Sequence, residues 1–231
     1  MENVTCVIPA RLSSSRFPGK PLYIIEGREL ILRVCDIAAK VEKIDDIIVA
    51  TEDEKIATVV KQAGYNAIIT PEQPTCTHRV AWVAENHLTH TDYVVNLQGD
   101  EPCISPQSIN GMIDYTLYHD LKCVQAAYEV SKEDILDEDC VKAVVNNGLV
   151  CYLTRVPEVI TKSLYGIAGL YTYDIETIRD FPHYDMKMVN AWQGLDTFGF
   201  IGKVKVNVFQ LAQRPHAVDR ITDIQKVIDS L

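Results

Sequence analysis

The stretch VIPARLSSSRFPGKPL, residues 7–22, decides how the rest of the chain is interpreted. It begins as a short apolar run that ends at a proline, which is typical of a buried strand. The loop that follows carries Arg11, Arg16 and Lys20, and Gly19 allows the backbone to approach a ligand closely. In parallel α/β sheets, ligands bind beyond the carboxyl ends of the strands. We therefore expect this loop to bind an anionic ligand such as a polyphosphate.

The positions of the glycines in this loop exclude two common classes of phosphate-binding protein. The loop contains neither the GxxxxGK[ST] pattern of a P-loop nor the GxGxxG pattern of a dinucleotide-binding turn. An ordinary P-loop NTPase and a Rossmann dehydrogenase are therefore excluded. A solvated basic loop without a ligand remains the alternative, because isolated surface arginines and lysines are common.

The overall composition excludes several classes of function. The chain has 231 residues, of which 47% are hydrophobic, and a formal net charge of −10. This acidic balance argues against a nucleic-acid partner, which would need a broad basic surface. We expect no membrane segment, because no apolar run approaches the ~18 residues of a spanning helix. Seven dispersed cysteines without a CxxC pair, and no secretory signal, predict reduced thiols and a cytoplasmic location.

Apolar runs and helical periodicities alternate through the first 120 residues. The pattern predicts strands at 4–9, 46–51, 66–70 and 92–98, separated by helices at 29–43, 52–64 and 77–87. Helices of this length between strands indicate right-handed βαβ units. The predicted fold is therefore α/β, with a doubly wound, mainly parallel sheet of a Rossmann-like, nucleotide-binding type.

The second part of the chain is richer in predicted strands. These lie at 121–130, 140–147, 149–155, 165–173 and 203–209, and a closing helix is expected at 219–231. The acidic run at 131–140 is expected to be a solvated loop. Because no linker is evident, we expect a single domain over 1–231, with a small β-rich inserted lobe at approximately 121–205.

A second chemical signal is NLQGDEP, residues 96–102, where an apolar strand ends in a glycine and two acids. Asp100 would lie at the carboxyl end of that strand, where it could hold a Mg²⁺ ion that bridges phosphates. The alternative is an ordinary turn, since Asp and Gly both favour turn geometry.

Together, IPAR…SRFPGKPL, IIVATEDEKIA and VVNLQGDEP resemble the CMP-KDO synthetases, the 3-deoxy-manno-octulosonate cytidylyltransferases. They resemble more loosely the CMP-sialate synthetases, which share the nucleotidyltransferase fold. The resemblance continues through residues 140–155 and 166–173 and ends at 217–227. It therefore covers most of the chain, in the family's order.

The resemblance implies a set of site residues. The nucleotide-binding residues that it implies are Ala10, Arg11, Arg16, Lys20, Arg79 and Gln98. The catalytic residues are Arg16, Lys20 and Asp100, and the Mg²⁺ ligands are Asp100 and Asp219. The acceptor-binding residues are Gln98, Arg155, Tyr173 and Gln193, although Tyr173 is equally well interpreted as a core aromatic. The family also implies a homodimer formed through the inserted lobe.

The chain departs from the family pattern near the implied acceptor side. Cys76 and His78 stand where the family has a glycine and an acid, and His78 is interpreted as a polar residue at a helix start. The polar segment before residue 169 is short, and Gln193, beside Trp192, is the sole match found to the family's sugar-binding segment.

The expected function is the transfer of CMP from CTP to an acidic sugar, either KDO or a related ulosonic acid, with Mg²⁺. A phosphonate acceptor, another nucleoside triphosphate and a non-catalytic nucleotide-binding homologue remain open as alternatives.

Overall fold

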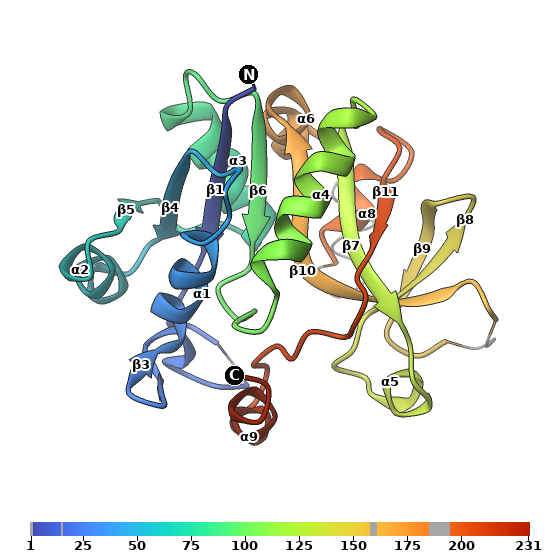
Figure 1. The fold of residues 1–231 in the computed structure, drawn as a ribbon. Coiled ribbons are helices and arrows are strands. Elements are labelled where there is room, and N and C mark those ends of the chain that lie inside the picture. Colours follow the sequence, from blue (N-terminus) through green and yellow to red (C-terminus); the bar gives the residue numbers. More distant parts are fainter. Residues whose placement is uncertain (1, 15, 158–160, 185–194) are drawn as a thin grey trace.

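The computed structural model describes residues 2–14, 16–157, 161–184 and 195–231. Its centre is a mixed sheet that, in these residues, contains nine strands (Figure 1). In chain order they are β1 (Val4–Pro9), β4 (Asp46–Thr51), β5 (Asn66–Ile69), β6 (Tyr93–Leu97), β7 (Cys123–Glu129), β8 (Lys142–Asn146), β9 (Leu149–Thr154), β10 (Leu164–Asp174) and β11 (Asn207–Gln210). Their order in the sheet is β5-β4-β1-β6-β10-β7-β11-β9-β8. The short strands β2 (Ile24–Ile25) and β3 (Arg28–Glu29) form a separate hairpin.

The two halves of the sheet differ in strand direction. Strands β5, β4, β1 and β6 are parallel to one another, as the alternating pattern of the sequence predicts. Strand β10 runs antiparallel to β6, β7 and β8, and β8 and β9 form an antiparallel hairpin. This hairpin turns at Asn147 and Gly148, both with positive φ, as a tight hairpin turn requires. The α/β fold is confirmed, but its parallel character is concentrated in the first half.

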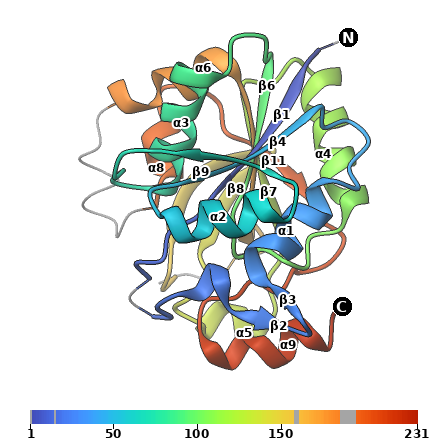
Figure 2. The same ribbon diagram turned by 90° about the vertical axis from the view of Figure 1, so that its left-hand side faces the viewer.

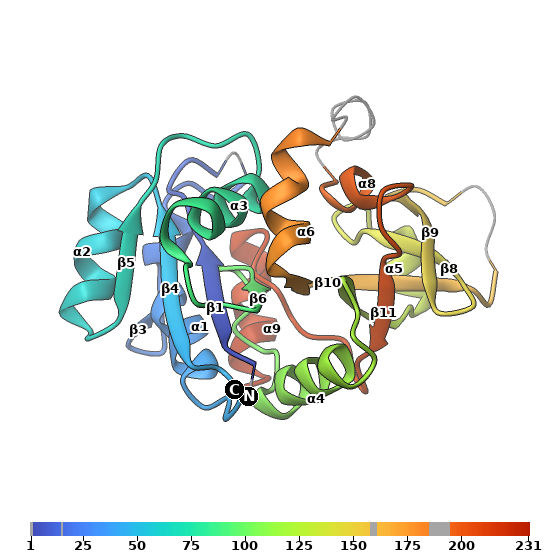
Figure 3. The ribbon, with the colours of Figure 1, turned by 90° about the horizontal axis from the view of Figure 1, so that it is seen from above.

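Helices cover both faces of the sheet (Figure 3). One face packs against α1 (Leu30–Ala38), α2 (Glu54–Gln62) and α4 (Pro106–Tyr118). The other packs against α3 (Cys76–His87), α6 (Ile175–Asp180) and α8 (Thr197–Phe200). Each helix buries an apolar stripe against the strands, so the sheet has a hydrophobic core on both sides.

Two elements differ from the sequence-based expectations. Helix α4 was not predicted, although Ser105 accepts a hydrogen bond from the Ser108 backbone and Pro106 occupies its first turn, both common start signals. The acidic run expected to be a solvated loop forms the short helix α5 (Lys132–Leu136). Reciprocal hydrogen bonds between Ser131 and Asp134 cap its first turn.

The C-terminal segment packs beside the N-terminal loop (Figure 2). In place of one closing helix, it forms the 3₁₀ turn η3 (Ile221–Asp223) and helix α9 (Ile224–Ile228). A separate apolar cluster joins Val218 and Val227 to Phe17, Ile25 and Leu30. This cluster fixes the basic loop, which contains the 3₁₀ turn η1 (Lys20–Leu22), against the end of the chain.

The predicted lobe is continuous with the central sheet, because β8 and β9 join it through β10 and β11. The chain turns from β10 through α6 into the 3₁₀ turn η2 (Phe181–His183). None of the helices in the described ranges is both long and apolar enough to cross a membrane.

Candidate active site

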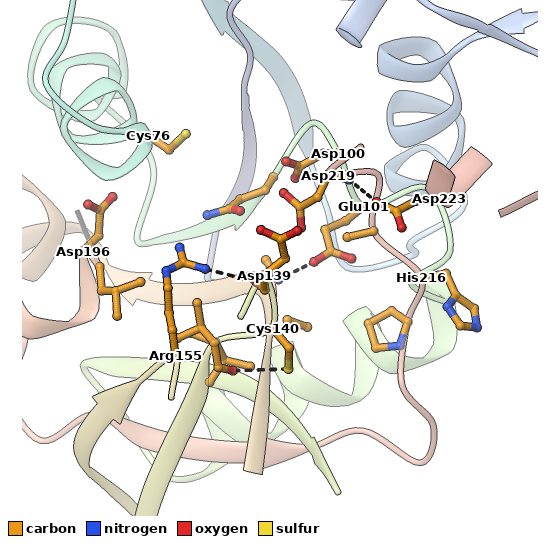
Figure 4. Close-up of a pocket in the computed structure, with 18 of the residues that line it drawn as sticks. Cys76, Asp100, Glu101, Asp139, Cys140, Arg155, Asp196, His216, Asp219 and Asp223 are labelled. Carbon is orange, nitrogen blue, oxygen red and sulfur yellow. Dashed lines mark hydrogen bonds between the residues drawn. The ribbon is translucent and has the colours of Figure 1, made fainter. Parts of the chain in front are cut away.

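A pocket of about 390 Å³ opens where strands β1 and β6 end and where β10 passes beside them (Figure 4). The basic loop, the turn after β6, the middle of β10 and the segment before η3 line it, together with the start of α3 and the segments around Asp139, Arg155 and Asp196. Their lining residues include Arg11, Arg16, Gln98, Asp100, Glu101, Ala168, Gly169, Tyr171, Arg214 and Asp219. The pocket therefore lies at the carboxyl ends of the parallel strands, where the sequence predicted a ligand.

The turn after β6 is tied to β10. The Gln98 backbone N–H donates to the Gly169 carbonyl at 2.8 Å, and the Gly169 N–H donates to Glu101 Oε1 at 2.6 Å. A Cβ atom added at Gly169 would lie 2.8 Å from Gln98 Oε1 and 2.9 Å from Gln98 Cβ, so a larger residue there would force the turn or the strand to shift. A Cβ atom on Gly99 would likewise meet the Pro9 carbonyl at 3.0 Å. These close approaches fix the Gln98 side chain above β10, inside the pocket.

Glu101 is buried beneath this turn, with 4% of its surface exposed. Burial, and then the neighbouring Asp100 carboxylate, raise the pKa of Glu101 to about 8. Its Oε2 atom has no hydrogen-bond partner among the described residues. Glu101 therefore holds β10 to the turn as a largely protonated group, whereas Asp100 presents its carboxylate to the pocket.

Lys20 and Asp100 form the first of two ion pairs at the end of the pocket beside the basic loop. Lys20 Nζ donates to Asp100 Oδ2 at 2.7 Å and to the Val218 carbonyl at 2.6 Å. The Val218 N–H donates to the Asp100 carbonyl at 2.9 Å, which joins the C-terminal segment to the turn after β6. Burial lowers the pKa of Lys20, but the adjacent Asp100 carboxylate outweighs it and the net shift is upward. The lysine is therefore held charged.

Arg16 and Asp219 form the second ion pair. Arg16 Nη2 donates to Asp219 Oδ1 at 2.6 Å, and Arg16 Nη1 donates to Asp139 Oδ1 at 2.6 Å. Burial and the nearby Asp100 carboxylate raise the pKa of Asp219. Figure 4 shows Asp100 and Asp219 side by side. Two carboxylates from distant parts of the chain thus lie next to each other, and each is paired with a different cation, Asp100 with Lys20 and Asp219 with Arg16.

The donor set at this position suits Mg²⁺. Within the described residues, no group of three or more His, Cys, Asp or Glu side chains is arranged to hold a metal. Mg²⁺, however, usually binds one or two carboxylates, with substrate phosphates and waters completing its shell. Asp100 and Asp219 would supply two hard oxygen ligands of that kind beside the basic loop.

The opposite end of the pocket contains Asp196 and Arg155, with Cys76 near Asp196 (Figure 4). Asp196 Oδ2 accepts a hydrogen bond from the Thr77 backbone at 2.9 Å, at the start of α3. Its Oδ1 atom is buried without a partner in the described part of the chain, and burial raises the pKa of Asp196. Arg155 Nη1 donates to the carbonyls of Glu138 and Asp139 at 3.0 and 3.1 Å. This end offers one acceptor group and one cation to a second ligand.

Comparison with known proteins assigns the chain to a family. A model of the cytidylyltransferase family matches residues 5–198. The chain belongs to the cytidylyltransferase family. The predicted family resemblance and the predicted class, a CTP-dependent nucleotidyltransferase, are thereby confirmed.

Two curated relatives match this cytidylyltransferase over nearly its whole length. A 3-deoxy-manno-octulosonate cytidylyltransferase from Nitratidesulfovibrio vulgaris is 32% identical over 242 residues, covering 98% of this chain and 96% of the relative. The enzyme of the same name from an Anaeromyxobacter species is 30% identical over 235 residues, covering 98% and 96%.

Solved structures agree with the fold. A CMP:2-keto-3-deoxy-manno-octonic acid synthetase complexed with CTP superposes with a TM-score of 0.89 at 26% identity, covering 98% of this chain and 97% of that one. A glucose-1-phosphate thymidylyltransferase from Bacillus anthracis superposes with a TM-score of 0.75 at 14% identity, covering 97% and 93%. The second match shows only that the cytidylyltransferase shares its fold with thymidylyltransferases.

Most of the predicted site residues of the cytidylyltransferase meet at this pocket. Arg11, Arg16, Gln98, Asp100, Arg155 and Asp219 line it, and Lys20 reaches Asp100 from the adjoining loop. Ala10 is buried beside Gly99. Gln193 and Trp192 lie outside the described residues.

Two predicted site residues are placed elsewhere. Tyr173 is fully buried and its ring stacks on Phe200, which corrects the predicted acceptor contact in favour of a core aromatic. Arg79 is 2% exposed and donates to Thr70 and Glu52, so its guanidinium is used inside the protein rather than on the nucleotide. Both side chains were predicted to contact a substrate because of their position in a motif. Packing and internal hydrogen bonds place them inside the protein instead.

Cys76 and His78, which replace the family's glycine and acid, lie at the start of α3. The His78 backbone N–H and ring Nδ1 both make hydrogen bonds with the Thr75 hydroxyl, which agrees with a polar helix-start residue. Cys76 lines the pocket, and burial raises the pKa of its thiol to about 12. Its side chain therefore adds neutral bulk, not charge, beside Asp196.

Asp196 and Asp139 are pocket residues that the sequence analysis did not single out. Asp196 lies in the segment expected to bind the acceptor, and an acid directly before the apolar helix α8 was the available signal. Asp139 lies in the acidic run that was interpreted as a solvated loop. Neither could be placed without the tertiary contacts to α3 and to the basic loop.

Proposed function

We propose that this cytidylyltransferase transfers CMP from CTP to KDO or a closely related ulosonic acid and releases pyrophosphate, with Mg²⁺ as cofactor. The observation that carries the proposal is the pairing of Lys20 with Asp100 and of Arg16 with Asp219 at one end of a single pocket. The names of the curated relatives and the CTP complex of the superposed synthetase support the choice of both substrates.

The end of the pocket that contains Lys20, Asp100, Arg16 and Asp219, here called the nucleotide end, would bind the triphosphate and neutralise its charge. The reaction requires the anomeric hydroxyl of the acceptor to attack the α-phosphorus while pyrophosphate leaves on the opposite side. Arg11, Arg16 and Lys20 neutralise the phosphate oxygens and stabilise the negative charge of the leaving group. Asp100 and Asp219 would hold Mg²⁺, which supplies a Lewis acid for the phosphates when bound.

The acceptor end would orient the sugar acid. The Arg155 guanidinium suits a carboxylate, and the Asp196 carboxylate, which lines the pocket, can accept a hydrogen bond from a sugar hydroxyl. Gln98 lies between the two ends, where it can contact either substrate. Positioning and charge neutralisation are sufficient for this reaction, so the mechanism needs no covalent nucleophile.

The assembly and location of the enzyme are part of the same proposal. We expect a homodimer formed through the lobe at approximately 121–205, which sedimentation analysis would test. Each of the seven cysteines is free, which supports a reducing compartment such as the cytoplasm.

The decisive experiment measures pyrophosphate release with each of four nucleoside triphosphates across a panel of KDO, other ulosonic acids and phosphonates. We expect release with CTP and a ulosonic acid, and a CMP-sugar product by mass spectrometry. Release only with UTP or ATP would refute the CTP assignment, and release only with a phosphonate would refute the acceptor. Tight CTP binding without turnover of any acceptor would identify a non-catalytic homologue.

A further inference from the structure

Asp139 joins three segments of the chain at the rim of the pocket (Figure 4). It lies between α5 and β8, and its carboxylate accepts hydrogen bonds from two arginines of other segments. Arg16 Nη1 donates to Oδ1 at 2.6 Å, and Arg220 Nε donates to Oδ2 at 2.5 Å. Arg220 Nη2 also approaches Oδ1 at 3.4 Å. One carboxylate thus holds the basic loop and the segment after Asp219 together.

This carboxylate has no part in the proposed reaction. It is not one of the paired acids, Asp100 and Asp219. Its backbone carbonyl accepts a hydrogen bond from Arg155, but its carboxylate binds the arginines of the basic loop and of the C-terminal segment. The hydrogen bonds of Arg220, followed by those of Arg16, lower the pKa of Asp139, so the side chain is ionised. An ionised acid at the entrance of a site for a polyanion opposes binding unless it moves or is displaced.

The two arginines are suited to a different partner. A guanidinium can donate a bidentate pair of hydrogen bonds to a carboxylate or, equally well, to a phosphate. Arg16 belongs to the predicted phosphate-binding loop, and Arg220 directly follows the predicted metal ligand Asp219. Both side chains are partly exposed, Arg16 at 37% and Arg220 at 55%. Both also line a hollow that shares Arg16, Asp139 and Arg155 with the pocket, so an extended ligand in the pocket can reach them.

We propose that Asp139 competes with the triphosphate of the nucleotide for Arg16 and Arg220, and that Arg220 is a further phosphate-binding residue. The carboxylate holds both arginines in the ligand-free protein and releases them when CTP binds. This inference rests on the proposed function, because it takes CTP as the nucleotide. Its consequence is that the native enzyme binds CTP more weakly than its cationic residues alone would allow.

The test compares CTP binding by calorimetry, with and without Mg²⁺, in the wild type and in an Asp139→Asn variant. The Asp139 backbone N–H donates to Asp137 Oδ1, a contact that the substitution retains, and a thermal melt verifies the fold. We expect the variant to bind CTP about fivefold more tightly, the size that two modest, partly exposed ion pairs produce. Damage to the fold would weaken binding instead, so the direction of the change separates the two explanations.

Glu138→Gln is the matched control, because Glu138 is exposed, lies in the same segment and carries the same charge. It reports the general effect of removing one negative charge near a polyanion, and we expect it to stay within twofold of the wild type. Asp139→Glu should bind CTP as the wild type does. If Asp139→Asn binds CTP no more tightly than Glu138→Gln, the competition does not exist.

Arg220 is tested in the Asp139→Asn background, where it is free of its carboxylate. There, Arg220→Gln is expected to weaken CTP binding about fivefold, and an unchanged affinity would overturn its role as a phosphate ligand. Failure of the proposed acceptor is distinguishable from failure of this inference. CTP binding that tightens in Asp139→Asn, without CMP transfer to any ulosonic acid, would refute only the acceptor.

Discussion

The two ends of the pocket are built by different halves of the sheet. The nucleotide end is formed by loops that follow β1 and β6, two adjacent parallel strands whose carboxyl ends meet at one edge. The acceptor end is formed by β9, β10 and the start of α8, in the mostly antiparallel half. The first end could be inferred from local sequence, whereas the second depends on contacts between distant segments.

The ends also differ in how their charges are satisfied. At the nucleotide end Lys20 pairs with Asp100 and Arg16 with Asp219, so the charges neutralise one another before a ligand binds. At the acceptor end Asp196 keeps one buried oxygen without a partner among the described residues. When CTP binds, the nucleotide end would have to exchange these ion pairs for contacts with phosphate. When the sugar acid binds, the acceptor end would gain a hydrogen bond. Four substitutions test this difference.

The largest effect is expected for Asp100→Asn, which removes charge from the nucleotide end and keeps the side chain's shape. It takes away one Mg²⁺ ligand and the partner of Lys20, so kcat/KM for CMP transfer should fall about 10³-fold. Pyrophosphate release measures it. Asp114→Asn, at a surface ion pair with Lys43, is the control and should leave turnover unchanged. Normal turnover in Asp100→Asn would show that the catalytic role assigned to Asp100 is wrong.

Gly169→Ala tests the contact between β10 and the turn after β6, which lies between the two ends of the pocket. The added Cβ atom would lie 2.8 Å from Gln98 Oε1 and 2.9 Å from Gln98 Cβ, so either the turn or β10 must shift. The free energy of unfolding, from urea denaturation, should fall by about 2 kcal/mol. The control Gly111→Ala lies in α4, where its Cβ would meet only the Phe209 ring, at 3.3 Å, and should cost less. Equal stability of the two variants would mean that Gln98 is free to move aside.

Asp196→Asn tests the acceptor end alone. The amide oxygen can still accept the Thr77 N–H, but the second oxygen is replaced by an NH₂ donor and the negative charge at this pocket-lining position is lost. We expect KM for the sugar acid to rise about tenfold, as for one lost hydrogen bond to a charged group. The dissociation constant of CTP should not change. A parallel loss of CTP affinity would show that the two ends are not separate.

The smallest effect is expected for His78→Gln, which should change how the free energy of unfolding depends on pH. Burial lowers the pKa of His78, so below about pH 6.5 the unfolded chain binds a proton that the folded protein does not. Stability from this group is therefore present above that pH and is lost as the pH falls. His78→Gln should flatten the decline in unfolding free energy between pH 7 and pH 5, measured by urea denaturation. His90→Gln, at an exposed position, should leave the decline as it is.

The sequence predicted those parts of the site that follow from local pattern. An apolar run followed by a polar loop located Lys20, and the same logic located Asp100 at the end of β6. Both positions depend only on where a strand ends. The strands β1, β4, β5 and β6 were predicted for the same reason, since they are short apolar runs between turn signals.

Residues whose environment is set by tertiary packing were not predicted. Arg79 was expected at the nucleotide, but Glu52 and Thr70 bind it inside the protein. Tyr173 was expected at the acceptor, but its side of β10 faces the core. Asp196 is positioned by α3, more than a hundred residues earlier in the chain. A single sequence gives the type of such residues but not the neighbours that direct them.

The apolar cluster that joins Phe17 to Val218 has a consequence for how the enzyme is made. A ribosome produces the basic loop about 200 residues before Val218, an interval of roughly 10–40 s at ordinary rates of synthesis. Until then the loop lacks Val218 and Val227 as packing partners, and Lys20 lacks the Val218 carbonyl to which it donates. The proposed triphosphate site is therefore completed only by residues that are synthesised about 200 positions after the basic loop.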